Sequence, residues 1–198
     1  SRCFPLPPAC ATFVGMNKYL SDIVSYFEYL SMKHPELQHA ETEGDRVFEV
    51  VAYEDAFSDF KTAGQEKRFF VRVILPTVRF ENQGDNARKM YQMGMVVGRY
   101  YSRREGSRSE MVQAWSDAER VADDFLARMV ADSRNGYALF NNSMDKIQNL
   151  NITGDFWDTQ GDGSYCAVMY MFEMGLFRCL SPDDATDYAE WTDGGLTI

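Results

Sequence analysis

The sequence is short of the side chains that most enzymes and nucleic-acid-binding proteins use. Of its 198 residues, two are histidine and four are cysteine, and no spacing among them matches a zinc site. Lysine and arginine number 20 against 30 aspartates and glutamates, which gives a net charge of −10. A surface of that sign repels phosphates and argues against binding nucleic acid from outside. No apolar run approaches the roughly 18 residues of a membrane-spanning helix.

Motifs that could carry chemistry are few and incomplete. Glu119 and Asp123 could share a helix face as an acid/base or metal pair, but no histidine or further carboxylate completes a site, so a solvated helix face is the interpretation. The aspartates of Gly154–Ser164 miss the calcium-loop register, which favours a long hairpin connection. His34 and His39 flank the end of a predicted helix, where a helix-end partner or solvent is favoured over a metal. We therefore predict no catalytic, cofactor-binding or metal site and no enzyme activity.

Composition divides the chain into three parts. Hydrophobic residues make up 45% and charged residues 25%, which is ordinary for a folded domain. Three of the six prolines fall in the first eight residues, and they interrupt the apolar core that a signal peptide would need. We expect residues 1–15 to be an upstream or cloning-derived disordered segment, residues 16–180 to form a single α+β domain, and residues 181–198 to be an acidic C-terminal tail.

Hydrophobic periodicity predicts elements in the order α-β-β-α-α-β-β. The first helix has Asn17 as its cap and stops before Pro35. The segment 85–103 also tolerates a strand, but helix is the prediction, with Gly94 and Gly98 allowing close packing on the sheet. The predicted fold is α+β, with a small antiparallel sheet of about four strands packed against two or three helices. The other expected elements are strands at 46–53 and 67–75, a helical turn at 56–60, a helix at 107–135, and strands at 144–153 and 167–177.

Two local signals refine these elements. Ser107 and Glu110 have the spacing of a capping box at the start of the long helix. After Pro76 the second strand can continue to Phe80 at a sheet edge, because proline cannot donate to the ladder. Cys166 and Cys179 could form a disulfide between neighbouring strands, but two buried free thiols are favoured.

Beyond the order of elements, two segments of the sequence resemble a known group of proteins. The sequence AWSDAERVADDFLARMVADSRNGYALFNNSMDKIQNL at 114–150, followed by YCAVMYMFEM at 165–174, resembles small head-tail connection proteins of tailed bacteriophages and prophages. The similarity is to the tail-completion and tail-terminator group and covers roughly residues 16–177. It implies a long helix packed on a small antiparallel sheet, with copies assembled in a ring around the DNA channel. The group has no invariant signature, so no catalytic residue carries over.

The resemblance implies a structural virion protein at the head-tail or tail-end junction, assembled in the bacterial cytoplasm. Its expected partners are further copies of itself in a ring and neighbouring head or tail proteins. DNA would pass nearby without specific binding, and no membrane is involved. The alternative is a small intracellular protein-binding module of a mobile genetic element, also without enzyme activity. The candidate interface residues are Trp115, Phe125, Trp157, Tyr170, Phe172 and Trp191.

Overall fold

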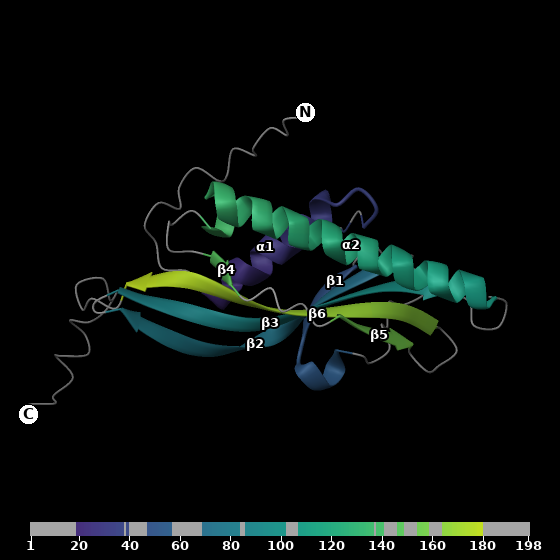
Figure 1. The fold of residues 1–198 in the computed structure, drawn as a ribbon, viewed down its shortest axis with the longest axis horizontal. Helices are drawn as coiled ribbons and strands as arrows, with labels where there is room; N and C mark the ends of the chain where they lie inside the picture. Colours follow the sequence, from purple (N-terminus) through teal and green to yellow (C-terminus); the bar gives the residue numbers. More distant parts are fainter. Residues whose placement is uncertain are drawn as a thin grey trace, which may run out of the picture.

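Three long strands form the centre of the structure (Figure 1). The computed structural model describes residues 19–37, 39, 47–56, 69–83, 86–101, 107–136, 138–140, 146–148, 154–158 and 164–179. The strands are β2 (Phe69–Gln83), β3 (Asn86–Tyr101) and β6 (Ser164–Cys179). β3 lies between the other two and pairs antiparallel with both. Its position in the middle of the sheet explains why Met93, Met95, Val96 and Val97 are buried on both faces.

Shorter strands complete the sheet on its two sides. β1 (Phe48–Val51) runs parallel to β2, whereas β4 (Lys146–Gln148) and β5 (Gly154–Asp158) both pair antiparallel with β6. The order is β1-β2-β3-β6-β4, with β5 also on β6. The predicted α+β class is confirmed. The described part of the sheet holds six strands rather than about four, and its β1 pairing is parallel.

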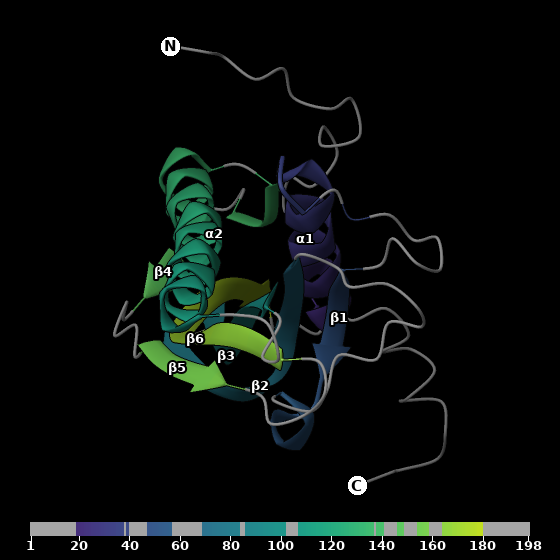
Figure 2. The same ribbon diagram turned by 90° about the vertical axis from the view of Figure 1, so that its right-hand side faces the viewer.

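Both long helices cover one face of this sheet (Figures 1 and 2). α1 (Leu20–Lys33) lies over β1 and β2, and α2 (Arg108–Asn135) lies over β3 and β6. Burial of apolar side chains between the helices and the sheet is the main stabilising contribution. The largest side chains of this core include Phe27, Phe69, Tyr91, Met93, Met95, Phe125, Met129, Phe140, Phe172 and Met174.

The ends of the helices follow the capping rules. Ser107 Oγ accepts from the backbone N–H of Glu110 at 3.4 Å, and Glu110 Oε2 accepts from the N–H of Ser107 at 2.5 Å, which confirms the predicted capping box. Gly136, at φ 66°, ends α2 in the left-handed conformation. At α1 the cap is Tyr19, whose N–H donates to Asp22 at 2.7 Å. The predicted cap, Asn17, lies outside the described residues.

The prediction of a helix at 85–103 is wrong, because this segment forms β3. Gly94 and Gly98 belong to the strand, on the face opposite the helices. A Cβ at Gly98 would lie 2.1 Å from Cε1 of Phe70, and one at Gly94 would lie 2.7 Å from Cδ1 of Ile74. The two glycines therefore leave room for β2 side chains, and their spacing is unrelated to helix packing.

Other predicted boundaries moved. The expected hairpin connection at 154–164 contains β5, and the strand expected at 144–153 is reduced to the three residues of β4 in the described chain. A 3₁₀ turn covers Tyr53–Asp55, just before the helical turn expected at 56–60, of which 57–60 lie outside the described residues. A second such turn covers Ala138–Phe140.

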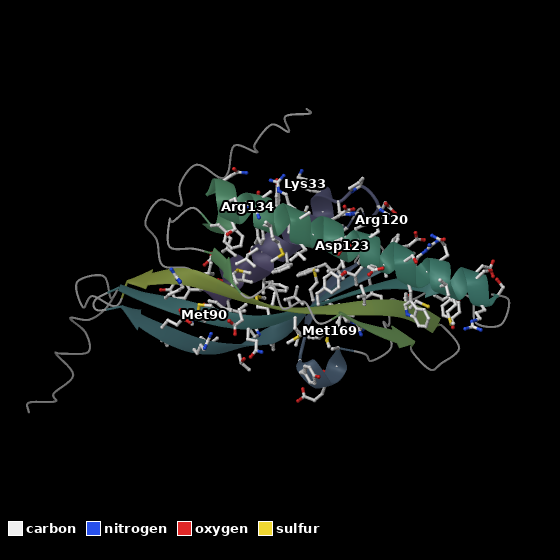
Figure 3. All side chains as sticks on the ribbon, in the orientation of Figure 1. Lys33, Met90, Arg120, Asp123, Arg134 and Met169 are labelled. Carbon is white, nitrogen blue, oxygen red and sulfur yellow. The ribbon has the colours of Figure 1, made fainter. Side chains whose placement is uncertain are left out.

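A smaller apolar cluster lies on the face of the sheet opposite the helices. Arg72 is buried there, and it donates from Nε to Glu49 and from Nη1 to the carbonyl of Ala56 at 3.1 Å. These bonds tie the 3₁₀ turn to the sheet. Met169 belongs to the same cluster and points away from the helices in Figure 3. The members are Ala56, Phe70, Ile74, Val96, Tyr165, Ala167 and Met169.

The positions of the cysteines settle one open alternative. Cys166 and Cys179 lie in the same strand, β6. At about 3.3 Å per residue, an extended strand places them about 40 Å apart, far beyond the reach of a disulfide. Cys166 is buried and in no disulfide, as predicted, whereas the side chain of Cys179 lies outside the described residues.

Candidate functional site

A buried polar cluster joins the two helices. Asp132 of α2 is 2% exposed; it accepts from the hydroxyl of Tyr26 at 2.8 Å and from Nε of Arg128 at 3.0 Å. Burial, followed by the nearby Asp132 carboxylate, raises the pKa of Tyr26. The phenol therefore stays protonated and acts as a fixed donor. Because Tyr26 and Arg128 both donate to the Asp132 carboxylate, we interpret the cluster as a structural link between α1 and α2.

Asp123, one of the two carboxylates considered as an acid/base pair, also forms a structural hydrogen bond. It lies on α2 (Figure 3), where its Oδ1 accepts from the hydroxyl of Tyr170 at 2.8 Å. Burial, and then this hydrogen bond, raise the pKa of Tyr170. Glu119 is exposed on the same helix. Asp123 thus fastens α2 to β6, and Glu119 lies on the solvated face.

The two histidines contact neighbouring elements. His34 Nε2 lies 3.3 Å from Oδ2 of Asp124, and its ring stacks on Phe125 with centroids 5.8 Å apart. His39 Nδ1 accepts from the N–H of Val47 at 3.1 Å. Within the described part of the chain, no group of three or more His, Cys, Asp or Glu side chains is placed to hold a metal ion.

The structure separates the six predicted interface residues. Phe125 and Phe172 are 2% exposed and Tyr170 is 6% exposed, all in the core between helices and sheet. Burial inside the subunit leaves these three no surface to offer a partner. Trp115 is half-buried on α2. Trp157 is placed by its backbone on β5, opposite Ala167, while its side chain and all of Trp191 lie outside the described residues.

Three exposed apolar side chains lie close together on the outer part of β2. Leu75 is 48% exposed, Val78 45% and Phe80 56%. β1 pairs only with residues 71–74 of β2, and within the described chain no strand pairs with the same side of 75–83. We call residues 75–83 the open β2 edge. An uncovered edge with apolar side chains is the usual starting point for pairing with another strand.

The side chains of Val78 and Phe80 lie on the helix-bearing face of the sheet. Val78 is opposite Tyr91, a core residue, and Phe80 is opposite Lys89, and directly opposed side chains share a face. The ammonium of Lys89 lies 5.9 Å from the ring centroid of Phe80 and 5.1 Å from that of Tyr91. The helix layer therefore covers Tyr91 and stops short of Val78 and Phe80.

The opposite face of the open β2 edge is polar. Thr77 Oγ1 donates to Gln92 Oε1 at 3.3 Å, and Arg79 Nη2 donates to Glu173 Oε2 at 3.2 Å. Arg79 also lies 3.4 Å from Glu81, two residues along the same strand. The edge thus has an apolar face beside the helices and a face of alternating charge on the other side.

Backbone hydrogen bonds of β2 alternate in direction along the strand. The N–H of Val71 donates to the carbonyl of Val47 at 2.7 Å, on the β1 side. Odd-numbered residues up to Val73 therefore point their backbone polar groups toward β1, and Ile74 points its own toward β3.

A bulge reverses this alternation in the outer part of β2. Pairing moves from Ile74 opposite Gly94 to Thr77 opposite Gln92, so that β2 contains one extra residue there. Beyond the bulge, odd-numbered residues point toward β3. The outward-pointing backbone N–H and C=O groups of the open β2 edge are those of Val78, Phe80 and Asn82.

The sequence predicted that this segment is an edge strand, but it did not predict that its apolar side chains form an exposed surface. Pro76 marked an edge strand continuing to Phe80, and the structure confirms that strand. Strict alternation along β2 predicts that Val78 and Phe80 point away from the helices, as Ile74 does. The bulge shifts the alternation by one residue, so that both side chains lie on the helix-bearing face. Three apolar residues at 75, 78 and 80 beside a proline were the available signal.

Comparison with known proteins adds no relative. No protein-family model matches the chain, and no curated protein matches its sequence. Among the described helices, none is long and apolar enough to span a membrane.

Proposed function

We propose that the protein is a structural virion component of a tailed phage or prophage, acting at the head-tail or tail-end junction by assembling with copies of itself in a ring. The observation that carries the self-assembly is the open β2 edge with Leu75, Val78 and Phe80 exposed on it. The resemblance of residues 114–150 and 165–174 to tail-completion and tail-terminator proteins supplies the biological setting.

The arrangement of layers favours association over isolation. Outward-pointing backbone groups of the open β2 edge can add a strand from another chain, while the exposed apolar side chains lose water on contact. A closed ring also needs a second, different surface on each copy. The exposed face of α2, which lies over β3 and β6 in Figure 1, offers such a second surface.

Charge agrees with a position beside DNA. At a net charge of −10, a ring of copies presents phosphates with a mostly repulsive wall. DNA can pass through such a ring without being held, because stable contact needs clustered lysine and arginine.

The test is the assembly state of the full chain. Light scattering after size-exclusion chromatography, followed by negative-stain electron microscopy, is expected to give a discrete oligomer with ring-shaped particles. A chain that stays monomeric at high concentration, with no ring in micrographs, contradicts the proposal.

The second candidate is a small binding module that captures a strand of another protein on the open β2 edge. The same exposed side chains support it, because strand addition needs one open edge and one extended partner. A monomeric chain that binds a partner strand one to one, encoded away from portal, capsid and tail genes, would favour this module over the virion component.

A further inference from the structure

We propose that the open β2 edge pairs with the same edge of a second copy, antiparallel, about a two-fold axis that passes beside Phe80. This inference rests on the self-association part of the proposed function and specifies its contact. It follows from three properties of the edge: the direction of its backbone groups, the order of its charges, and the limits of its free length.

The backbone groups fit this register. An antiparallel pair centred on Phe80 sets the Phe80 residues of the two copies opposite each other, and both point their N–H and C=O outward. Each Phe80 then exchanges two hydrogen bonds with its counterpart, as in a closely spaced antiparallel pair. Val78 opposes Asn82 of the second copy in the same way, because both also point outward.

The charges select this register among those that the backbone allows. With Phe80 at the centre, Arg79 opposes Glu81 of the second copy, and Glu81 opposes Arg79 of the second copy. The two side chains are 59% and 36% exposed, and their ion pair with each other within one copy can be exchanged for the pairs across the axis. If the axis moved one residue along the strand, it would set Arg79 opposite Arg79 of the second copy, or Glu81 opposite Glu81 of the second copy. Like charges directly opposite each other are destabilising.

The apolar face gains from the same contact. A two-fold axis normal to a continuous sheet keeps the helices of both copies on one side. Val78 and Phe80 lie on that side, so the two pairs of apolar residues meet in one patch. Their exposed surface, 45% and 56%, is removed from water where the helix layer of each copy ends.

The free length of the edge matches the paired segment. On one side, the last position that β1 occupies is Ile74, opposite Val51. On the other side, β2 ends at Gln83, which pairs with Asn86 of β3. Pro76 has no N–H to donate and closes the ladder before β1. A second copy of residues 77–83 fills the interval, whereas an unrelated strand would gain the hydrogen bonds without the two charge pairs.

Charge exchange tests the register. Because Arg79 also contacts Glu173 at 3.2 Å, all proteins carry Glu173→Gln, so that this contact is equally changed in each. Arg79→Glu or Glu81→Arg alone sets like charges across the axis twice and is expected to weaken pairing about tenfold. The double variant Arg79→Glu with Glu81→Arg restores opposite charges and is expected to return the dissociation constant to within about threefold of the starting protein.

A second pair of variants tests the edge itself. Phe80→Lys places a solvated charge at the centre of the contact and is expected to weaken pairing at least about tenfold. Met32→Lys is the matched control, since Met32 is also apolar and 48% exposed but lies on α1. Analytical ultracentrifugation measures the association, and circular dichroism melting shows that every variant is folded.

The outcomes separate the contact from the proposed function. Rings that form regardless of the charge variants overturn the two-fold contact and leave the virion function standing. Pairs that follow the charge exchange without any ring support the contact and count against the ring. A double variant that binds no more tightly than the single ones, a Phe80→Lys protein that associates like Met32→Lys, or a starting protein that stays monomeric overturns the contact.

Discussion

Tyr26 of α1 donates a hydrogen bond to Asp132 of α2 across 106 positions of sequence, at a distance of 2.8 Å. The pair lies within the helix layer, and Arg128 shares the same carboxylate. Fixing the two helices to each other fixes the surface that they form over the sheet. The first predictions concern this link.

Removing the hydroxyl of Tyr26 should destabilise the fold without changing its shape. Tyr26→Phe leaves the buried Asp132 carboxylate with Arg128 alone, and the lost bond should lower the free energy of unfolding by about 1–3 kcal/mol. Tyr29→Phe is the matched control on the same helix, because the Tyr29 ring packs beside the core and under Lys33. Its expected effect is within about 0.5 kcal/mol. Urea unfolding measures both; equal effects would argue against the link.

Alkaline pH should weaken the fold through the same phenol and through Tyr170. The pKa of each is raised, first by burial and then by its carboxylate partner. Above the ordinary tyrosine value of about 10, the unfolded chain loses these protons while the folded chain keeps them. The stabilisation is therefore complete below that pH and is lost as the pH rises toward the folded pKa values. Unfolding free energies measured from pH 8 to 11 should fall, and more steeply in the natural chain than in Tyr26→Phe with Tyr170→Phe.

Arg72 should matter far more than an exposed arginine with a similar partner. Arg72→Leu removes the bonds to Glu49 and to the carbonyl of Ala56 from a buried position, with an expected cost of about 3–5 kcal/mol. Arg120→Leu is the control, since Arg120 is 47% exposed and pairs with Glu36 at 2.6 Å. Exposed pairs contribute about 0–1 kcal/mol. Chemical denaturation of both variants tests the contrast, and similar losses would contradict it.

Gly98 should tolerate no side chain while Phe70 lies across it. A Cβ at Gly98 would meet Phe70 Cε1 at 2.1 Å and Cζ at 2.3 Å, so Gly98→Ala should cost about 1–3 kcal/mol through overpacking. Phe70→Leu alone opens a cavity. Combined with Gly98→Ala it should cost less than the sum of the single changes, because the methyl group fills part of that space. Strict additivity in urea unfolding would contradict this contact.

Local signals were enough to predict the parts of the fold that local contacts determine. The capping box of Ser107 and Glu110 and the apolar stripe of α2 are satisfied within the helix and its first packing layer. The prediction of a helix at 85–103 was wrong because a strand that is buried on both faces has apolar residues at both helical and strand spacings. Its two neighbours, β2 and β6, decide the matter, and β6 begins more than sixty residues later.

The candidate site was hidden for a related reason. Aromatic residues at Phe125, Tyr170 and Phe172 suggested an interface, yet the helix layer covers all three. Val78 and Phe80 look no different in sequence, but they lie beyond that layer and past a bulge. Exposure depends on which part of the sheet the helices reach, and periodicity within one strand does not contain that information.

DNA should interact weakly with the assembled protein. The net charge of −10 per chain repels phosphates, and the adjacent basic residues Arg88 and Lys89 point to opposite faces of β3. At about 150 mM salt we expect a dissociation constant for duplex DNA weaker than the roughly 10⁻⁴ M at which non-specific binders begin. Fluorescence anisotropy of a labelled duplex measures it. Micromolar binding that falls steeply with salt would show that phosphates are held, and a wall that holds phosphates would slow the DNA it is proposed to let pass.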